Sequence, residues 1–336
     1  MKRLGIFVGE HGNWTFFRDI YADLAQQYQT DVFVEKHYNT PLLYGRLNRW
    51  SYYNQIKQIL RRNDLCFFEW ASELLEAATH MEKQGLIVTR LHSYELYAWA
   101  PKINWANVDR IILVSQAMRA KFCVLYPDHA HKTTVIYNAK PLDLFFPVDK
   151  PFTWQLGMLC SLNPRKRIYE IILMVAELRR HGYPAHLHIA GGALHGGDLD
   201  EYHVALHRLV EKLDLGQYVT FYDHITDTPG WLHQIDVFIS NSYWEGHQVA
   251  LVEAMAAGCQ CYSHFWDGAE EVLPPENLYV TEDELSEKVI AYSRLAETER
   301  HALRMKMRAI ACERYDAKRQ HQEIAQLLEG ALAAGR

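Results

Sequence analysis

The alternation of apolar and amphipathic segments constrains the fold of this 336-residue chain more than any other feature. Short apolar segments alternate with longer segments of helical periodicity, which is the pattern of doubly wound α/β domains. The pattern occurs twice, and the chain is long enough for two domains with separate cores. The predicted strands are Leu4–Val8, Asp31–Glu35, Leu65–Glu69, Leu86–Leu91, Arg110–Ser115 and Thr133–Tyr137, then Gln155–Cys160, Ala185–Ala190, Tyr218–Tyr222, Val237–Ser240, Cys261–His264 and Leu278–Val280.

The segment 141–151 contains three prolines and no periodicity, so it is the predicted linker between the domains. We therefore predict a first domain over residues 1–145 and a second over residues 152–310. The remaining residues, 311–336, are predicted to be helical.

Composition excludes several classes of protein. A formal net charge of −6 argues against nucleic-acid binding by the chain as a whole. The six cysteines are scattered without a Cys-x-x-Cys pair, which is typical of reduced thiols. No apolar run approaches the roughly 20 residues of a membrane span, and the N-terminus does not fit a signal peptide. These features predict a cytoplasmic protein.

Two carboxylates flank the start of one predicted helix. Glu245 lies in the loop after the strand Val237–Ser240, and Glu253 lies eight residues later in the helix. The unpaired amides and positive dipole end of a helix N-terminus suit a phosphate. This order of groups suits a nucleoside diphosphate-sugar, with Glu245 at the sugar hydroxyls and Glu253 at the ribose. The alternative is that Glu245 only interacts favourably with the helix dipole and that Glu253 is a solvated surface acid.

The segment Trp244-Glu245-Gly246-x6-Glu253-Ala-Met-Ala-x-Gly258 resembles the signature of family 4 glycosyltransferases, also called glycosyl transferases group 1. The resemblance implies the GT-B fold, in which two Rossmann-like domains face each other across a cleft. It also implies donor binding by Gly246 and by the amides of His247 and Gln248, and a last helix that crosses back to the first domain.

A basic turn, Pro164-Arg165-Lys166-Arg167, follows the strand Gln155–Cys160. Cations at the carboxyl edge of a parallel sheet are well placed to neutralise a diphosphate. The family usually has an Arg and a Lys five residues apart here. Lys166 matches the Lys, whereas Ser161 occupies the Arg position, so Arg165 and Arg167 both remain open as its replacement. The alternative is a solvated basic loop.

Further residues are implied by the same resemblance. His92 ends the strand Leu86–Leu91 and corresponds to a histidine beside the donor sugar, with Arg90 and Glu95 as weaker candidates nearby. The donor-binding turn is Gly191-Gly192, and the acceptor-binding loop contains Glu10, His11, Gly12 and Trp14.

No metal is expected, because such enzymes rely on cationic side chains and a helix end. The pair Asp198-x-Asp200 is interpreted as the acidic start of a helix rather than as metal ligands.

A basic and aromatic segment lies near residues 44–62. Between Lys36 and Asn63 there is no acidic residue, and six Lys or Arg side chains alternate with Tyr and Trp. Such a helix suits an anionic membrane surface, at about 1 kcal/mol per well-placed cation. The alternative is a solvated basic face whose aromatic rings pack inward.

The sequence thus predicts a retaining glycosyltransferase that moves a sugar from a nucleoside diphosphate-sugar to a hydroxyl of a saccharide or glycolipid. Synthesis of bacterial surface polysaccharide or lipopolysaccharide, at the inner membrane face, is the expected setting. Two alternatives stay open: a non-catalytic paralogue that binds a nucleotide-sugar or a partner, with Ser161 as a sign of decay, and a nucleotide-sugar epimerase of the same fold.

Overall fold

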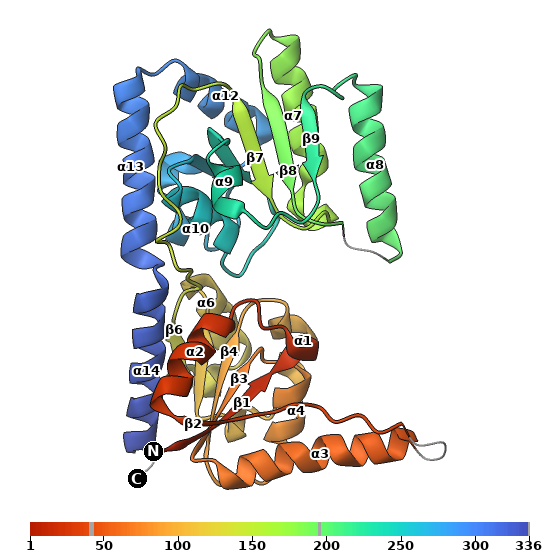
Figure 1. The fold of residues 1–336 in the computed structure, drawn as a ribbon, viewed down its shortest axis with the longest axis vertical. Coiled ribbons are helices and arrows are strands. Elements are labelled where there is room, and N and C mark those ends of the chain that lie inside the picture. Colours follow the sequence, from red (N-terminus) through yellow and green to blue (C-terminus); the bar gives the residue numbers. More distant parts are fainter. Residues whose placement is uncertain (40–43, 194–195, 335–336) are drawn as a thin grey trace. The chain divides into compact units, whose positions relative to one another are not determined.

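The computed structural model describes residues 1–39, 44–193 and 196–334, without the side chains of His11 and Asp198. The chain divides into two compact units, Met1–Asn138 with Ala317–Arg336, and Ala139–Asp316. Each unit contains one six-stranded sheet flanked by helices (Figure 1). All strand pairs are parallel, so the predicted α/β class is confirmed.

The sheet of the first unit has the order β2-β1-β3-β4-β5-β6. Its strands are β1 (Arg3–Val8), β2 (Gln29–Val32), β3 (Leu65–Glu69), β4 (Leu86–Leu91), β5 (Arg110–Leu113) and β6 (Thr133–Val135). Its α-helices are α1 (Gly9–Gly12), α2 (Arg18–Gln27), α3 (Tyr44–Arg62), α4 (Glu73–Thr79), α5 (Glu95–Ala98), α6 (Gln116–Leu125) and α14 (Ala317–Ala334).

The last helix, α14, is part of the first unit's core. Ile324, Leu328 and Leu332 recur on one face of α14 and are buried in the cluster that also contains Ile20 of α2 and Val88 of β4. This spacing is that of an amphipathic helix with one apolar stripe. The other face of the sheet is covered by α3, α4 and α6, whose apolar side chains join a separate cluster.

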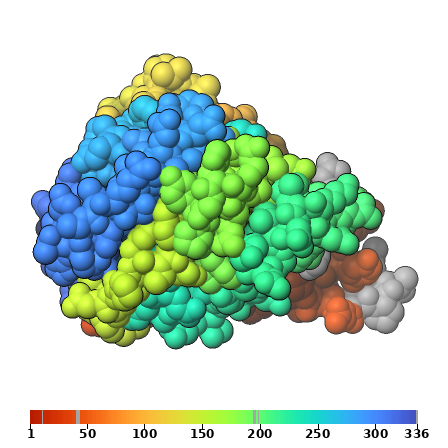
Figure 2. Space-filling model, turned by 90° about the horizontal axis from the view of Figure 1, so that it is seen from above, coloured from red at the N-terminus to blue at the C-terminus, as the bar shows by residue number. Residues whose placement is uncertain are grey.

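The sheet of the second unit has the order β12-β11-β10-β7-β8-β9. Its strands are β7 (Gln155–Leu159), β8 (His186–Ala190), β9 (Val219–Tyr222), β10 (Val237–Ser240), β11 (Gln260–His264) and β12 (Leu278–Tyr279). Its α-helices are α7 (Ile168–Arg180), α8 (Asp198–Lys212), α9 (Thr228–Leu232), α10 (Val249–Ala256), α11 (Ala269–Val272), α12 (Glu282–Ser293) and α13 (Glu297–Arg314). Helices α12, α7 and α8 lie side by side across the surface of this unit (Figure 2).

Some predicted bounds are wrong. Strand β2 spans Gln29–Val32 rather than Asp31–Glu35, because this edge strand pairs only with β1 and the chain leaves the sheet after Val32. The first long helix, α2, begins at Arg18, after a turn in which the Phe17 and Arg18 amides both donate to the Trp14 carbonyl.

The limits of the two units differ slightly from the predicted domain limits. The first unit ends at Asn138, ahead of the proline-rich linker, and the final helical region breaks between Arg314 and Ala317. Among the described residues, no helix has both the length and the apolar character that crossing a membrane requires.

The two glycines after β8 differ in what their backbone demands. Gly191 has φ +125°, and a Cβ there would lie 2.1 Å from the Cys160 carbonyl oxygen. Among the described residues, no atom lies within 4 Å of a Cβ built on Gly192. Close packing of the two carboxyl-terminal turns therefore requires glycine at the first position only.

We expect Gly191→Ala to destabilise the protein by at least about 2 kcal/mol, because it combines a strained φ with a backbone clash. Thermal unfolding of the unliganded protein measures this change. Gly192→Ala is the matched control and should leave Tm nearly unchanged. Equal Tm values for the two variants would contradict the close approach of Cys160.

Candidate functional site

Glu245 is the centre of a buried charge cluster in the second unit. Its carboxylate pairs with the Lys166 ammonium through Oε1 and with Arg165 through Oε2, at 3.2 Å. The Ser242 hydroxyl donates to Oε1 at 2.6 Å. The side chains of Lys166 and Glu245 are each only 9% exposed. The loop after β10 and the turn after β7 are far apart in sequence, and this cluster brings them together.

The backbone holds the same two segments in place. The Tyr243 amide donates to the Arg165 carbonyl at 3.0 Å, and an Arg165 guanidinium nitrogen donates to the Trp244 carbonyl at 3.2 Å. Strands β7 and β10 are neighbours in the parallel sheet, so the loops at their carboxyl ends meet at one edge. The topology thus positions the acid and the cations before any ligand binds.

Charge pairing decides the protonation state of Glu245. Burial alone would raise the pKa of this carboxyl, but the positive charges of Lys166 and Arg165 and the hydrogen bonds from Lys166 and Ser242 hold it below its usual range. Glu245 is therefore ionised at neutral pH. With two cations and one carboxylate, the cluster carries net positive charge.

Arg167 belongs to a different set of contacts. It has a left-handed backbone, φ +51°, and its guanidinium pairs with Glu282 at the start of α12. Asn241 links to both, because its amide donates to the Arg167 carbonyl at 3.1 Å and to Glu282 at 3.2 Å. Arg165 and Arg167 were the two candidates to replace the family's usual arginine. Of these, Arg165 pairs with the same Glu245 carboxylate as Lys166. The Ser161 hydroxyl accepts a hydrogen bond from Asn163 at 2.8 Å.

The N-terminus of α10 lies directly after this cluster in the chain. Gly246, His247 and Gln248 are buried, and the Gln248 side chain accepts a hydrogen bond from the Ser240 hydroxyl. The His247 ring packs against Tyr315 at 4.8 Å. Within the described residues no side chain caps the helix, so its first amides remain available to an anion.

Glu253, within α10, has the opposite electrostatic character to Glu245. Burial raises the pKa of its carboxyl to about 7, against the opposing positive charge of Lys140. In the described part of the chain no donor hydrogen-bonds to this carboxylate. A hydroxyl-bearing ligand could therefore supply the missing hydrogen bonds.

The Gly191-Gly192 turn lies beside the basic turn. The Cys160 amide donates to the Ala190 carbonyl at 2.9 Å, and the Leu162 amide donates to the Gly192 carbonyl at 3.2 Å. The glycines thus border the segment that leads to Lys166. Gly191 is already required there by the packing of the two turns.

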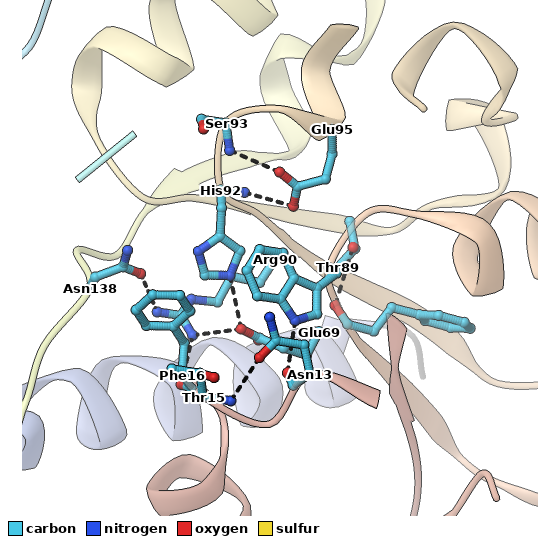
Figure 3. A network of polar contacts seen from close by, with 12 residues as sticks. Asn13, Thr15, Phe16, Glu69, Thr89, Arg90, His92, Ser93, Glu95 and Asn138 are labelled. Carbon is cyan, nitrogen blue, oxygen red and sulfur yellow. Dashed lines mark hydrogen bonds and ion pairs between the residues drawn. The ribbon is translucent and has the colours of Figure 1, made fainter. Parts of the chain in front are cut away.

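A second buried network surrounds His92 in the first unit (Figure 3). The imidazole Nε2 lies 2.9 Å from Oε1 of Glu69, and an Arg90 guanidinium nitrogen lies 3.0 Å from the same oxygen. The ring stacks on Trp70 at 4.1 Å and lies 5.3 Å from Phe16. Glu69 and Arg90 are essentially inaccessible to solvent. Because a carboxylate only accepts, the Nε2–H donates to Glu69.

The sequence did not single out Glu69 or Trp70. Glu69 ends a fully buried strand, and its register partner on β4 is Arg90, so an acid and a base meet on neighbouring strands. Arg90 is therefore not a surface charge. Glu95 is also fully buried, and its carboxylate accepts the His92 and Ser93 amides at 3.1 and 2.9 Å.

The N-terminal loop forms the short helix α1. The Glu10 amide donates to Glu73 at 3.3 Å, and Tyr94 hydrogen-bonds to the Glu10 side chain. Gly12 has φ +79°, and no described atom lies within 4 Å of a Cβ built there. Trp14 packs edge-on against Tyr21 at 5.3 Å. The side chain of His11 lies outside the described residues.

In the described part of the chain, no three His, Cys, Asp or Glu side chains form a set that could ligate a metal. The side chain of Asp198 lies outside that part. Asp200 accepts a hydrogen bond from the Gly196 amide at 3.0 Å, just ahead of α8.

Comparison with known proteins identifies the class of the chain. Residues 154–297, which include Lys166, Glu245 and Glu253, match the family described as Glycosyl transferases group 1. The second unit thus carries a group 1 glycosyltransferase domain, and the chain has the GT-B fold. A comparison with curated protein sequences found no significant match.

Solved glycosyltransferase structures align with nearly the whole chain. Sucrose-phosphate synthase from Thermosynechococcus elongatus is 17% identical, with 99% of this chain and 100% of that chain covered and a TM-score of 0.81. HepE from Anabaena, in complex with UDP and glucose, is 20% identical, with 98% and 99% covered and a TM-score of 0.73. The lipopolysaccharide outer core galactosyltransferase WaaB is 16% identical, with 98% and 99% covered and a TM-score of 0.71.

The raised pKa of Glu253 predicts how stability of this glycosyltransferase depends on pH. A carboxyl whose pKa is higher in the folded than in the unfolded chain stabilises the fold at low pH, and this stabilisation disappears as pH rises through about 7. Glu253→Gln removes the buried charge. Its free energy of unfolding should therefore exceed that of the wild type by up to about 3 kcal/mol at pH 8, with little difference near pH 4.5.

Thermal unfolding across this pH range measures the effect without substrate. Glu287→Gln, at an exposed position on α12, is the matched control and should follow the wild type at every pH. If the stability of Glu253→Gln also follows that of the wild type at every pH, burial of the ionised Glu253 carboxylate does not destabilise the fold as predicted.

Proposed function

We propose that this glycosyltransferase uses a nucleoside diphosphate-sugar and transfers the sugar with retention at the anomeric carbon, as family 4 enzymes do. The observation that carries the proposal is the buried Glu245–Lys166–Arg165 cluster beside the uncapped start of α10. The negative charge of a diphosphate would balance the net positive charge of this cluster and the positive end of the helix dipole.

The roles follow from charge. In the unliganded protein Lys166 and Arg165 form ion pairs with Glu245. The net positive charge of the three side chains attracts the diphosphate. As the bond to the sugar breaks, the two cations and the α10 amides near Gln248 stabilise the charge on the leaving diphosphate. One preorganised donor of this kind typically contributes about 3 kcal/mol.

The two acids have different tasks in this proposal. Glu245 is ionised and accepts hydrogen bonds from hydroxyls of the transferred sugar, whereas Glu253 accepts them from the ribose. The leaving phosphate takes the proton of the acceptor hydroxyl on the same face of the sugar. His92, held by Glu69, is proposed to hydrogen-bond the donor sugar through Nδ1.

The donor and the acceptor are proposed by class. HepE was solved with UDP and with UDP-glucose, so UDP is the first nucleotide to test beside GDP and ADP. WaaB acts on lipopolysaccharide outer core, and we propose a saccharide or glycolipid of the bacterial surface as the acceptor here. The place of the reaction would be the cytoplasmic side of the inner membrane.

Release of nucleoside diphosphate from a donor in the absence of acceptor tests the proposed function. Lys166→Met should lower this rate roughly 100-fold, because one stabilising cation is lost. Lys212→Met, at an exposed position on α8, is the matched control. Excess EDTA should leave the wild-type rate unchanged, since we propose that side-chain cations and the helix end replace a metal.

Three results would contradict this assignment. The first is a wild-type protein that neither hydrolyses a nucleotide-sugar nor gains thermal stability with UDP, GDP or ADP. The second is a Lys166→Met variant, folded by its thermal transition, that keeps the wild-type rate. The third is loss of activity in EDTA that Mn²⁺ or Mg²⁺ restores.

Helix α3 is the proposed contact with an anionic membrane surface. Arg46, Trp50, Tyr53 and Lys57 recur at helical spacing and are all exposed, and Arg49 lies over the Tyr53 ring at 5.9 Å. Trp50 is 63% exposed. This exposed stripe of aromatic and basic side chains supports docking over the alternative in which the aromatic rings pack inward.

The cations at the end of α3 are engaged elsewhere. Arg62 makes a two-bond pair with Asp31, and Arg61 pairs with Glu82 at 3.3 Å. Their charges are partly neutralised, so the surface that attracts anionic lipid is centred on Arg46 and Arg49.

Binding to phosphatidylglycerol vesicles at low ionic strength should therefore fall several-fold in Arg46→Gln/Arg49→Gln, at about 1 kcal/mol per cation. Arg61→Gln/Arg62→Gln is the control with the same change in charge and should bind more nearly as the wild type. Cosedimentation measures both, and high salt should release the protein. A wild-type protein that ignores these vesicles would favour an acceptor free in solution.

A further inference from the structure

A cavity of about 550 Å³ lies in the first unit, where β1 and β2 end. Its volume is within the range of small-molecule sites. The side chains that define its chemistry come from four segments of the unit: Trp14, Phe33, Glu35, His37, Tyr52 and Glu73. Tyr52 is contributed by α3 and Glu73 by α4.

This cavity is lined by negative charge, whereas the cluster around Glu245 carries net positive charge. Among the described residues that line it there is no Lys or Arg. Glu35 and Glu73 supply two carboxylates, and Glu35 lies 3.7 Å from the His37 ring. A phosphate or another carboxylate in this space would meet repulsion without a compensating cation.

The carboxylates also act on Tyr52. Burial raises the pKa of the Tyr52 phenol well above its usual range, and Glu73 and Glu35 add to the effect. The phenol is therefore a neutral donor and acceptor at any physiological pH. Its ring packs edge-on against Phe33 at 5.7 Å, so the orientation of the hydroxyl is held by neighbouring aromatic rings.

Aromatic faces beside carboxylates suit a sugar ring. A sugar ring has apolar C–H faces that pack on aromatic side chains such as Trp14 and Phe33. Its hydroxyls donate to carboxylates, and such charge-assisted hydrogen bonds are the stronger kind. A neutral sugar satisfies both sets of groups, whereas the phosphate of a sugar phosphate is repelled by the two carboxylates.

We propose that this cavity binds a neutral sugar ring of the acceptor and excludes phosphorylated sugars. The inference rests on the proposed glycosyl transfer and makes its acceptor class specific. In this arrangement charge sorts the two substrates: the diphosphate is attracted to Lys166 and Arg165, and the neutral ring to Glu35 and Glu73.

Ligand-observed NMR tests the proposal with two sets of probes, the methyl glycosides of glucose, galactose and mannose, and the 6-phosphates of the same sugars. At least one neutral glycoside should bind the full chain, and none of the phosphates should compete with it. Trp14→Ala and Glu35→Gln/Glu73→Gln should each weaken binding at least tenfold. Tyr97→Ala, at an exposed position of the same unit, is the control.

The charge-reversed variant Glu35→Lys/Glu73→Lys gives the sharpest result. It should lose the neutral glycoside and gain affinity for its 6-phosphate, a reversal that a merely destabilised protein would not show. The proposal is overturned if no neutral glycoside binds, if the phosphates bind the wild type equally well, or if both pocket variants retain binding. Donor hydrolysis without acceptor tests the proposed function separately, since it needs no ligand in this cavity.

Discussion

The pairing of one buried carboxylate with basic side chains at the carboxyl edge of each sheet organises both units. Glu245 is held by Lys166 and Arg165, and Glu69 by Arg90 and His92. Removing one partner of such a buried pair typically costs about 3–5 kcal/mol, because the other charge stays buried without compensation. The loops that carry these side chains are thereby fixed in position before a ligand binds, and preorganised charge is what stabilises a transition state.

The sequence predicted interior elements better than edges. The bounds of β3, β4 and β10 are as predicted, because strands with neighbours on both sides and helices on both faces are continuous apolar runs. The edge strand β2 is misplaced, since Val34 and Glu35 continue the β-like pattern but have no sheet partner. Lys166 and Glu245 were each predicted from local motifs, yet their direct pairing depends on the neighbouring positions of β7 and β10, which no local pattern encodes.

The same limit explains Glu69 and the arginine choice. An acid at the end of an apolar strand has no local motif, and its importance appears only when the β3–β4 register places it opposite Arg90. Arg165 and Arg167 are equivalent in the sequence as two bases beside Lys166. They separate in space because Arg167 adopts a left-handed backbone that directs it to Glu282, leaving Arg165 at Glu245.

Glu245 and Glu253 show how environment gives one residue type two roles. Both are largely buried, and burial raises the pKa of each carboxyl. Adjacent cations reverse this effect for Glu245, whereas the pKa of Glu253 stays at about 7. A permanently ionised acid suits hydroxyls beside a reacting carbon, because its charge persists through turnover. An acid that titrates near neutrality suits a remote contact, because ligand hydroxyls that donate to it favour the ionised form. In the proposed function, donor binding and ionisation of Glu253 are therefore thermodynamically linked, so that each strengthens the other.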